Sequence, residues 1–331
     1  MGSSRPGVRR PIHAGSWYED DPDILRAELR QMLGAEFAEG ATPDPGLKAV
    51  ISPHAGLRYS GSVAACVFAR LDVSKLSRVV LLGPSHHARL EGCAIPGPEV
   101  AAYRTPLGDL PLDQETLAAL RESKEFSHLP MHVDEAEHSV EMQLPFLAEL
   151  LLHGPKRPSV GLVPMLVGQV NAQSEARYGK LLAPLLQQEG TLFVISSDFC
   201  HWGAQFGYTR VGSTSLARTY REGPHPDNAR IEGLDREGMA LIEQQDAEGF
   251  RKYLQREGNT ICGRHPILVL LEALSTCQSS PVAVDFVKYA QSSALPGMPP
   301  PRTASVSYAC ARLPAAKIFH SARVFAQALC R

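Results

Sequence analysis

Four short polar segments carry most of the side chains that could bind a metal or move a proton. Three directly follow apolar runs and read SPHAG (52–56), GPSHH (83–87) and SSDFCHWG (196–203). The fourth, NTICGRHP (259–266), leads into an apolar stretch. Imidazole and thiolate are common ligands of transition metals, and imidazole and carboxylate also exchange protons. These segments therefore predict a metal site with proton-handling groups beside it, provided that the fold brings them together.

The metal ligands that we expect are His54, His86 and Cys262. His86 and His87 are adjacent, and successive side chains of an extended chain point in opposite directions, so at most one of them faces the site. Cys262 stands before the apolar stretch 266–274, where a helix N-terminus and Arg264 would lower the thiol pKa and favour the coordinating thiolate. Each residue taken alone also has an ordinary explanation. A histidine such as His54 could be a loop or capping residue, and Cys262 could be a structural cysteine.

Asp198 and His201 are the candidates for proton transfer. Two residues separate them, so a tight turn would place carboxylate and imidazole side by side, as an acid/base pair or as groups behind the ligands. The alternative is that Asp198 caps a short helix whose first turn holds His201. Cys200, between them, is the other cysteine for which a role beyond that of a buried thiol stays open.

Several further residues are candidates for the pocket around the site. The acidic segment 134–138 (DEAEH) precedes a helical pattern, so its usual role would be favourable charge in the first turn of a helix. The segment HAGSWY (13–18) offers a histidine and two aromatic side chains for the pocket. Alternatively, it is a hydrophobic anchor that fixes the start of the chain. Besides Asp198 and His201, the residues assigned to the surroundings of the site are His13, Trp17, His138, Glu141 and His265.

Hydrophobic patterning predicts the elements that must position these residues. The runs 47–51, 79–82 and 192–195 are rich in β-formers and too continuous for half-exposed strands, so they predict buried parallel strands. Helical patterns alternate with them, which predicts a single-domain α/β/α sandwich with a mainly parallel central sheet. The segments 282–289 and 303–313 would complete or edge this sheet. The helical patterns cover 62–71, 117–121, 140–151, 172–187, 247–256 and 266–274. Carboxyl ends of neighbouring parallel strands open onto a common crevice, where the three strand-following segments would meet.

Composition argues against several classes of function. The 331 residues carry a formal net charge of −2 with both signs interspersed, which gives no electrostatic footprint for nucleic acid or anionic lipid. No apolar run is long enough to cross a bilayer, and the start of the chain lacks the features of a secretory signal. The seven cysteines form no CxxC pair, which favours a reducing compartment such as the cytoplasm. A homodimer is compatible with the sequence, but no segment requires it.

Together the motifs resemble the MEMO family, named as mediators of ErbB-driven cell motility. The resemblance runs from HAGSWY at His13 through PHAG, GPSHH, YRTPLGDL, DEAEHSVEMQLP, SSDFCHWG and NTICGRHP to YAQSS and SVSYA, which ends at Ala309. It assigns residues 13–313 to one MEMO-like domain. Residues 1–12 remain as an N-terminal extension and 314–331 as a C-terminal extension with a helical pattern.

This resemblance implies the fold of class III extradiol dioxygenases (the LigB-like superfamily), which bind non-haem Fe(II) through two histidines and a carboxylate. His54 and His86 match the two histidines, and His201 matches the acid/base histidine of those enzymes. Cys262 stands where they have a glutamate, although Asp198 could supply a carboxylate in its place. A soft sulfur ligand favours Cu(I), Zn(II) or a differently tuned iron, which argues against ordinary ring cleavage.

The leading function that the resemblance implies is a metal-binding redox protein. Its cofactor would be iron (Fe2+) or copper (Cu+), with zinc as a further option. The protein would act in redox or in signalling and motility pathways of the cytoplasm or also the nucleus, and turnover of a substrate would make it a metal-dependent oxidoreductase. One alternative is an adaptor that binds phosphotyrosine peptides of receptor kinases between Trp17 and Tyr59, although residues 204–207 (AQFG) offer no cation for a phosphate. Another is a working extradiol dioxygenase.

Overall fold

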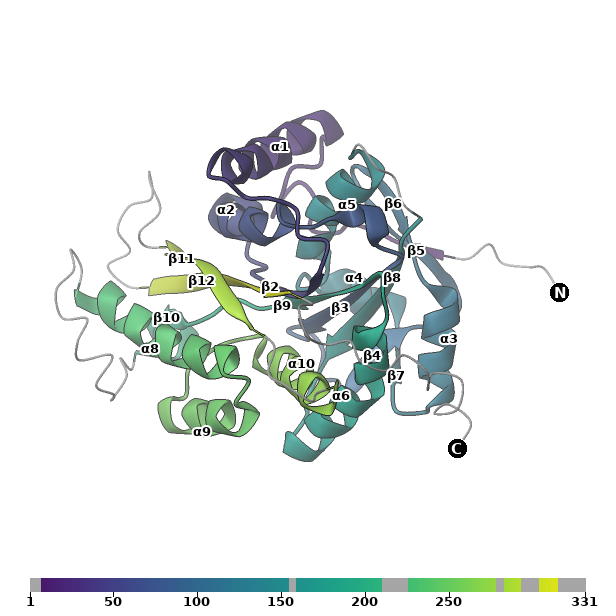
Figure 1. Cartoon of the computed structure of the whole chain (residues 1–331). Coiled ribbons are helices and arrows are strands. Elements are labelled where there is room, and N and C mark those ends of the chain that lie inside the picture. Colours follow the sequence, from purple (N-terminus) through teal and green to yellow (C-terminus); the bar gives the residue numbers. More distant parts are fainter. Residues whose placement is uncertain (1–6, 155–158, 210–225, 278–282, 293–303, 315–331) are drawn as a thin grey trace.

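The three predicted strands lie side by side at the centre of a nine-stranded sheet (Figure 1). They are β2 (Leu47–Ser52), β9 (Thr191–Ser196) and β3 (Arg78–Pro84), and β8 (Gly161–Val167) continues the parallel part beside β3. All residues of β2 and β9 are buried. This computed structural model describes residues 7–154, 159–209, 226–277, 283–292 and 304–314. It confirms the predicted α/β fold with a parallel sheet centre.

Antiparallel strands extend the sheet on both sides, so the sheet as a whole is mixed. On one side β12 (Ala304–Pro314) pairs with β2 and carries β11 (Asp285–Gln291) and β10 (His201–Gly203). On the other side β4 (Cys93–Pro96) pairs antiparallel with β8 and parallel with β7 (Ser127–Leu129). The two late segments predicted as strands correspond to β11 and β12.

Helices cover both faces of the sheet (Figure 1). One face carries α1 (Pro22–Ala38), α2 (Leu57–Phe68) and α5 (Leu144–Leu152). The other face carries α6 (Ala172–Gln187) and α10 (Arg264–Cys277), and α9 (Ala247–Glu257) packs beside α10.

The remaining helices are α3 (Gln114–Glu122) against β4 and β8, α4 (Met131–Ala136), and α8 (Pro226–Glu243) beside β11. Single 3-10 turns are η1 (Val73–Lys75), η2 (Glu141–Gln143) and η3 (Ala204–Phe206).

A small second sheet holds the start of the described chain. Its strand β1 (Gly7–Arg9) pairs with β5 (Val100–Thr105), which pairs with β6 (Gly108–Pro111). Arg9 is fully buried and donates to Asp134 Oδ1 (3.1 Å) and Glu141 Oε2 (2.6 Å). Residues 1–12 were expected to form an extension; within the described part of that stretch, two buried ion pairs anchor Arg9 to the domain. The C-terminal extension beyond Pro314 lies outside the described residues.

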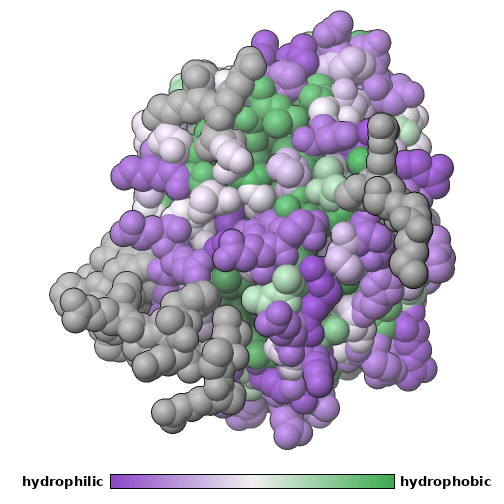
Figure 2. Space-filling model, turned by 90° about the vertical axis from the view of Figure 1, so that its right-hand side faces the viewer, coloured by the Kyte–Doolittle hydropathy of each residue, from purple (hydrophilic) through white to green (hydrophobic). Residues whose placement is uncertain are grey.

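The surface is mainly polar on the face shown in Figure 2, where hydrophobic residues appear between hydrophilic ones. This view looks onto the right-hand side of Figure 1, where α3 and the small sheet lie. Among the described residues, no helix is both long enough and apolar enough to cross a membrane.

Candidate metal centre

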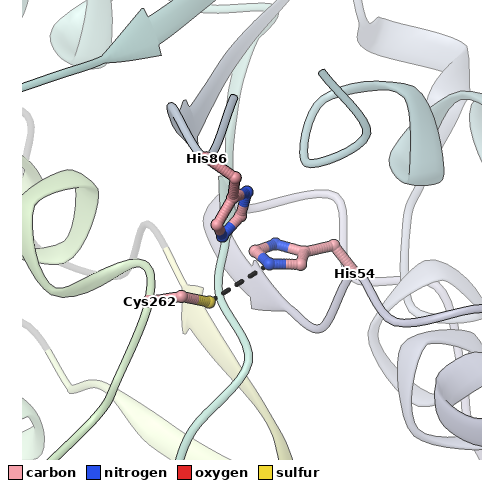
Figure 3. Close-up of side chains that lie close together, drawn as sticks. All are labelled: His54, His86 and Cys262. Carbon is pink, nitrogen blue, oxygen red and sulfur yellow. Dashed lines mark hydrogen bonds between the residues drawn. The ribbon is translucent and has the colours of Figure 1, made fainter. Parts of the chain in front are cut away.

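Three potential metal ligands converge at the carboxyl edge of the parallel strands (Figure 3). His54 follows β2, His86 follows β3, and Cys262 lies just before α10. Cys262 Sγ is 3.1 Å from His54 Nε2, and one ligand atom from each of the three residues lies within 4.8 Å of the others. Two imidazole nitrogens and one sulfur at these distances form a donor set that a single transition-metal ion can occupy.

A hydroxyl group determines which nitrogen of His54 is free. Ser196 Oγ donates its only hydrogen to Ser139 O (2.6 Å) and accepts a hydrogen bond from Gln143 Nε2 (3.0 Å). At 2.7 Å from the same oxygen, His54 Nδ1 must therefore be the donor, which leaves the lone pair of Nε2 for a ligand. Burial lowers the pKa of His54 well below its usual range, and neighbouring histidines lower it further. The ring is thus neutral, as metal binding requires.

A buried carboxylate orients His86 so that, as in His54, Nδ1 is engaged. Glu137 accepts hydrogen bonds from His86 Nδ1 (2.9 Å) and from the backbone N–H of the same residue (2.5 Å). Burial alone would raise the pKa of Glu137, but the hydrogen bonds and charge of His86 hold it at about 2. With Nδ1 engaged, Nε2 of His86 is the nitrogen left for a metal. Histidine ligands of metals commonly have such carboxylate partners.

The chain directly after Cys262 passes close to the end of β9, at Gly263. A Cβ on Gly263 would lie 2.5 Å from Ser196 O and would also overlap Ser197. The thiol pKa differs from expectation: desolvation raises it well above its usual value, the charge of Asp198 raises it further, and Arg264 compensates only in part. Arg264 does lower the thiol pKa, but burial outweighs it, so the predicted net lowering is wrong. A thiolate here needs a stronger positive partner, such as a metal ion.

Asp198 supports the ligands from behind. Its Oδ1 accepts the backbone N–H of His54 (2.8 Å), and its own backbone N–H donates to Cys262 Sγ (3.2 Å). Burial raises the pKa of its carboxyl group, although His201 and the hydrogen bonds act in the opposite direction. The helix-capping alternative is wrong, because residues 201–203 form β10. The carboxylate does not belong to the group of converging donor atoms found among the described residues.

His201 and His265 line a cavity of about 490 Å³ that also borders His86 and Cys262. His201 Nδ1 donates to the carbonyl of Phe199 (2.9 Å), so Nε2 is its free nitrogen. No hydrogen bond joins His201 to Asp198, both of which the structure describes. His265 Nδ1 binds Glu175 Oε1 (2.7 Å). The structure thus brings both predicted histidines to the cavity beside the three converging donors.

Further aromatic rings lie behind the site. The ring of His138 stacks on His86 at 4.6 Å between centroids and has Trp17 at 4.4 Å. Burial, aided by the charge of His86, lowers the pKa of His138 to about 3. His13 packs edge-on against His138, and its Nδ1 binds Glu141 Oε2 (2.9 Å). These four predicted surrounding residues therefore form one connected group next to His86.

Three other candidates stay apart from the converging donors. His87 is not one of the converging donors, although its ring lies edge-on to His138 at 5.7 Å between centroids. Tyr59 lies in the first turn of α2, with Arg58 5.7 Å from its ring centroid, and does not line the cavity beside the donors. Cys200 is buried, and burial together with Asp235 raises its thiol pKa, which fits a structural role.

A second group with ligand-like spacing consists of His86, Glu137 and His138. Its carboxylate already accepts hydrogen bonds from His86 and from the backbone N–H of Ser139 (2.9 Å). We therefore regard Glu137 as the group that orients His86 and not as a competing ligand.

Sequence reasoning missed the residues that orient the ligands. Glu137 falls in the acidic segment that was expected to charge the first turn of a helix, but α4 ends at Ala136 and the Glu137 side chain turns to His86. Ser196 is the last residue of β9 and the first of the polar segment 196–203, yet nothing in its type distinguishes it from its neighbour Ser197. Spacing along the chain carries no signal for either role, because both contacts join segments that are distant in sequence.

Known proteins resemble this chain over nearly its whole length. The profile of the family described as Memo-like protein matches residues 9–312. Protein MEMO1 of Danio rerio is 41% identical over 314 residues, covering 94% of this chain and 99% of that protein. Protein MEMO1 of Homo sapiens is 39% identical over 313 residues with the same coverage. A MEMO1 family protein of Schizosaccharomyces pombe is 38% identical, covering 92% of this chain and 98% of that protein. The chain therefore belongs to the Memo-like protein family.

Proposed function

We propose that this protein binds one redox-active metal ion, copper or iron, through Nε2 of His54, Nε2 of His86 and Sγ of Cys262. The observation that supports the proposal most strongly is the convergence of these three atoms within 4.8 Å of one another. On both histidines the other ring nitrogen is already engaged, by Ser196 and Glu137 respectively. Such an arrangement holds the free lone pairs ready for an ion before it arrives.

The donor set fits a soft or borderline ion. A thiolate with two imidazoles suits Cu(I), Zn(II) and iron better than Mg2+ or Ca2+, and copper or iron would supply one-electron redox chemistry. The chain leaves one side of the donor set facing the cavity that His201 lines. There Nε2 of His201 can accept or return a proton, while Asp198 holds the His54 loop through the backbone. A signalling or motility role in the cytoplasm is proposed on the family resemblance alone.

Metal analysis of matched cysteine variants tests this function. The wild type, Cys262→Ser and Cys277→Ser would be purified without oxygen, and iron, copper and zinc would be measured per chain. Cys277 is a suitable control because its half-buried thiol donates to Ala183 O (3.4 Å) and is not among the converging donors. We expect about one metal ion per chain in the wild type and in the control, and at least a tenfold loss of affinity in Cys262→Ser. Wild-type protein that takes up none of the three metals, or Cys262→Ser with unchanged affinity, would refute the proposal.

A further inference from the structure

The cavity beside the candidate metal centre has an uneven charge distribution. Its volume of about 490 Å³ suits a small organic ligand. Two arginines, Arg89 and Arg264, line it together with His201 and His265, whereas no aspartate or glutamate is among the described lining residues. A metal ion bound by His86 and Cys262 would add further positive charge at one wall. Such a cavity attracts anions.

Arg264 is the cation best placed to bind a ligand. Within the described part of the chain its guanidinium makes one hydrogen bond, from Nη1 to Ile261 O (3.1 Å), and no ion pair with a carboxylate. Arg89, in contrast, already has Glu91 at 3.4 Å, and both side chains are about three-quarters exposed. A partly buried guanidinium without an acidic partner retains donors that an anion can use in a two-pronged contact.

The neighbouring polar groups leave further positions for a ligand. Nδ1 of His265 is held by Glu175, and Nδ1 of His201 by Phe199 O. Among the residues that the structure describes, no hydrogen bond engages Nε2 of either ring. Both residues line the cavity with Arg264 and Cys262. The cavity lining therefore combines two of the candidate metal ligands, His86 and Cys262, with a guanidinium that has no carboxylate partner among the described residues. This combination would suit a ligand that has oxygen atoms at both ends.

We propose that this cavity binds a small organic dicarboxylate, with one carboxylate paired to Arg264 and the other directed to the metal position beside Cys262. The metal-directed half rests on the proposed function. The carboxylate half depends only on Arg264 and on the absence of acidic groups from the described lining. Carboxylate is favoured over a neutral ligand because only an anion offsets the cost of keeping an unpaired guanidinium partly buried.

Calorimetric titration with probes of graded length tests the proposal. Malonate, succinate and glutarate would each be compared with the corresponding diamide, on metal-loaded and metal-free protein. The proteins would be the wild type, Arg264→Gln, Arg264→Lys and the control Arg104→Gln, whose arginine is exposed and pairs with Asp109. We expect one dicarboxylate to bind at least tenfold more tightly than its diamide, and to bind about tenfold more weakly to Arg264→Gln. Arg264→Lys should recover part of the loss, and Arg104→Gln should match the wild type.

Metal content, measured on the same samples, separates failure of this proposal from failure of the metal site. If loaded protein binds diamides as well as dicarboxylates, or Arg264→Gln binds as tightly as the wild type, the ligand proposal is refuted and the metal site stands. Tighter binding of inorganic phosphate than of every dicarboxylate would also refute it. If the protein takes up no metal, the proposed function fails, while Arg264-dependent binding of a dicarboxylate would still support the carboxylate half.

Discussion

His54 and His86 leave the same ring nitrogen free for different chemical reasons. Nδ1 of His54 donates to the neutral hydroxyl of Ser196, whereas Nδ1 of His86 donates to the charged carboxylate of Glu137. A carboxylate partner increases the electron density on the opposite nitrogen more than a hydroxyl does. We therefore expect His86 to be the stronger donor of the two, even though its side chain is 28% exposed and His54 is buried.

The substitution Glu137→Gln should change how stability depends on pH. The folded-state pKa of Glu137 is about 2, below its usual value, so its ionised form stabilises the fold above about pH 5. This stabilisation, roughly 3 kcal/mol, is lost as the pH falls through 2. The difference in unfolding free energy between the wild type and Glu137→Gln should therefore shrink between pH 5 and pH 2. Urea unfolding with a chelator present measures it.

Glu91→Gln serves as the control for this experiment. The Glu91 side chain is 76% exposed and, within the described ranges, forms an ion pair with Arg89 alone. The unfolding free energy of Glu91→Gln should therefore follow that of the wild type at every pH. A difference between wild type and Glu137→Gln that stays constant from pH 7 to pH 2 would contradict the assigned role of Glu137.

For individual residues, the sequence was enough to choose the candidate ligands but not to find the residues that orient them. His54 and His86 were identifiable because each lies in a polar segment that directly follows a continuous apolar run, and the ends of neighbouring parallel strands meet at one edge of the sheet. Glu137 was not identifiable, because an acidic residue before a helical pattern is usually read as helix-end charge. Glu137 is buried next to the His86 imidazole because α4 ends at Ala136, and a single sequence does not reveal that end point.

Among the elements, the loop before α10 depends on one glycine. Gly263 donates its N–H to Ser197 Oγ (3.1 Å), and a Cβ there would overlap backbone and side-chain atoms after β9. Gly263→Ala should therefore push Cys262 away from His54. We expect a tenfold or greater loss of metal affinity and a destabilisation of about 1–3 kcal/mol, measured by metal titration and by thermal unfolding.

Gly34→Ala is the matched control, since a Cβ at Gly34 in α1 meets nothing within 4 Å. In a helix this change should leave metal affinity unaltered and should stabilise slightly. Equal metal affinity in Gly263→Ala and the wild type would show that the position of this loop does not govern the site.

Pattern reasoning found β2, β3 and β9 but missed β8, and Pro164 explains the miss. A proline within a run argues against a central strand because it cannot donate to the ladder. In the structure, β4 pairs with β8 only at Leu166 and Val167, so the ladder on that side does not extend to Pro164. The missed helix α1 did carry start signals, with Asp21 as N-cap and Pro22 in its first turn.

For the molecule as a whole, the candidate ligands join regions that are far apart in sequence. His54 and Cys262 are 208 residues apart, yet their side chains touch. Binding a metal to the folded state alone stabilises it according to the affinity and the free metal concentration. At a free concentration 100 times the dissociation constant, the gain is about 2.7 kcal/mol.

Metal loading should therefore raise the melting temperature of the wild type by about 5 °C, and a chelator should reverse the shift. The shift should be absent in Cys262→Ser and preserved in Cys277→Ser, whose thiol lies on α10 away from the donors. Scanning calorimetry of these three proteins, each metal-loaded and metal-stripped, measures this. An equal shift in Cys262→Ser would mean that the metal binds elsewhere on the chain. Since the three ligands come from both ends of the domain, we expect the shift to appear in a single cooperative transition and not in a separate local one.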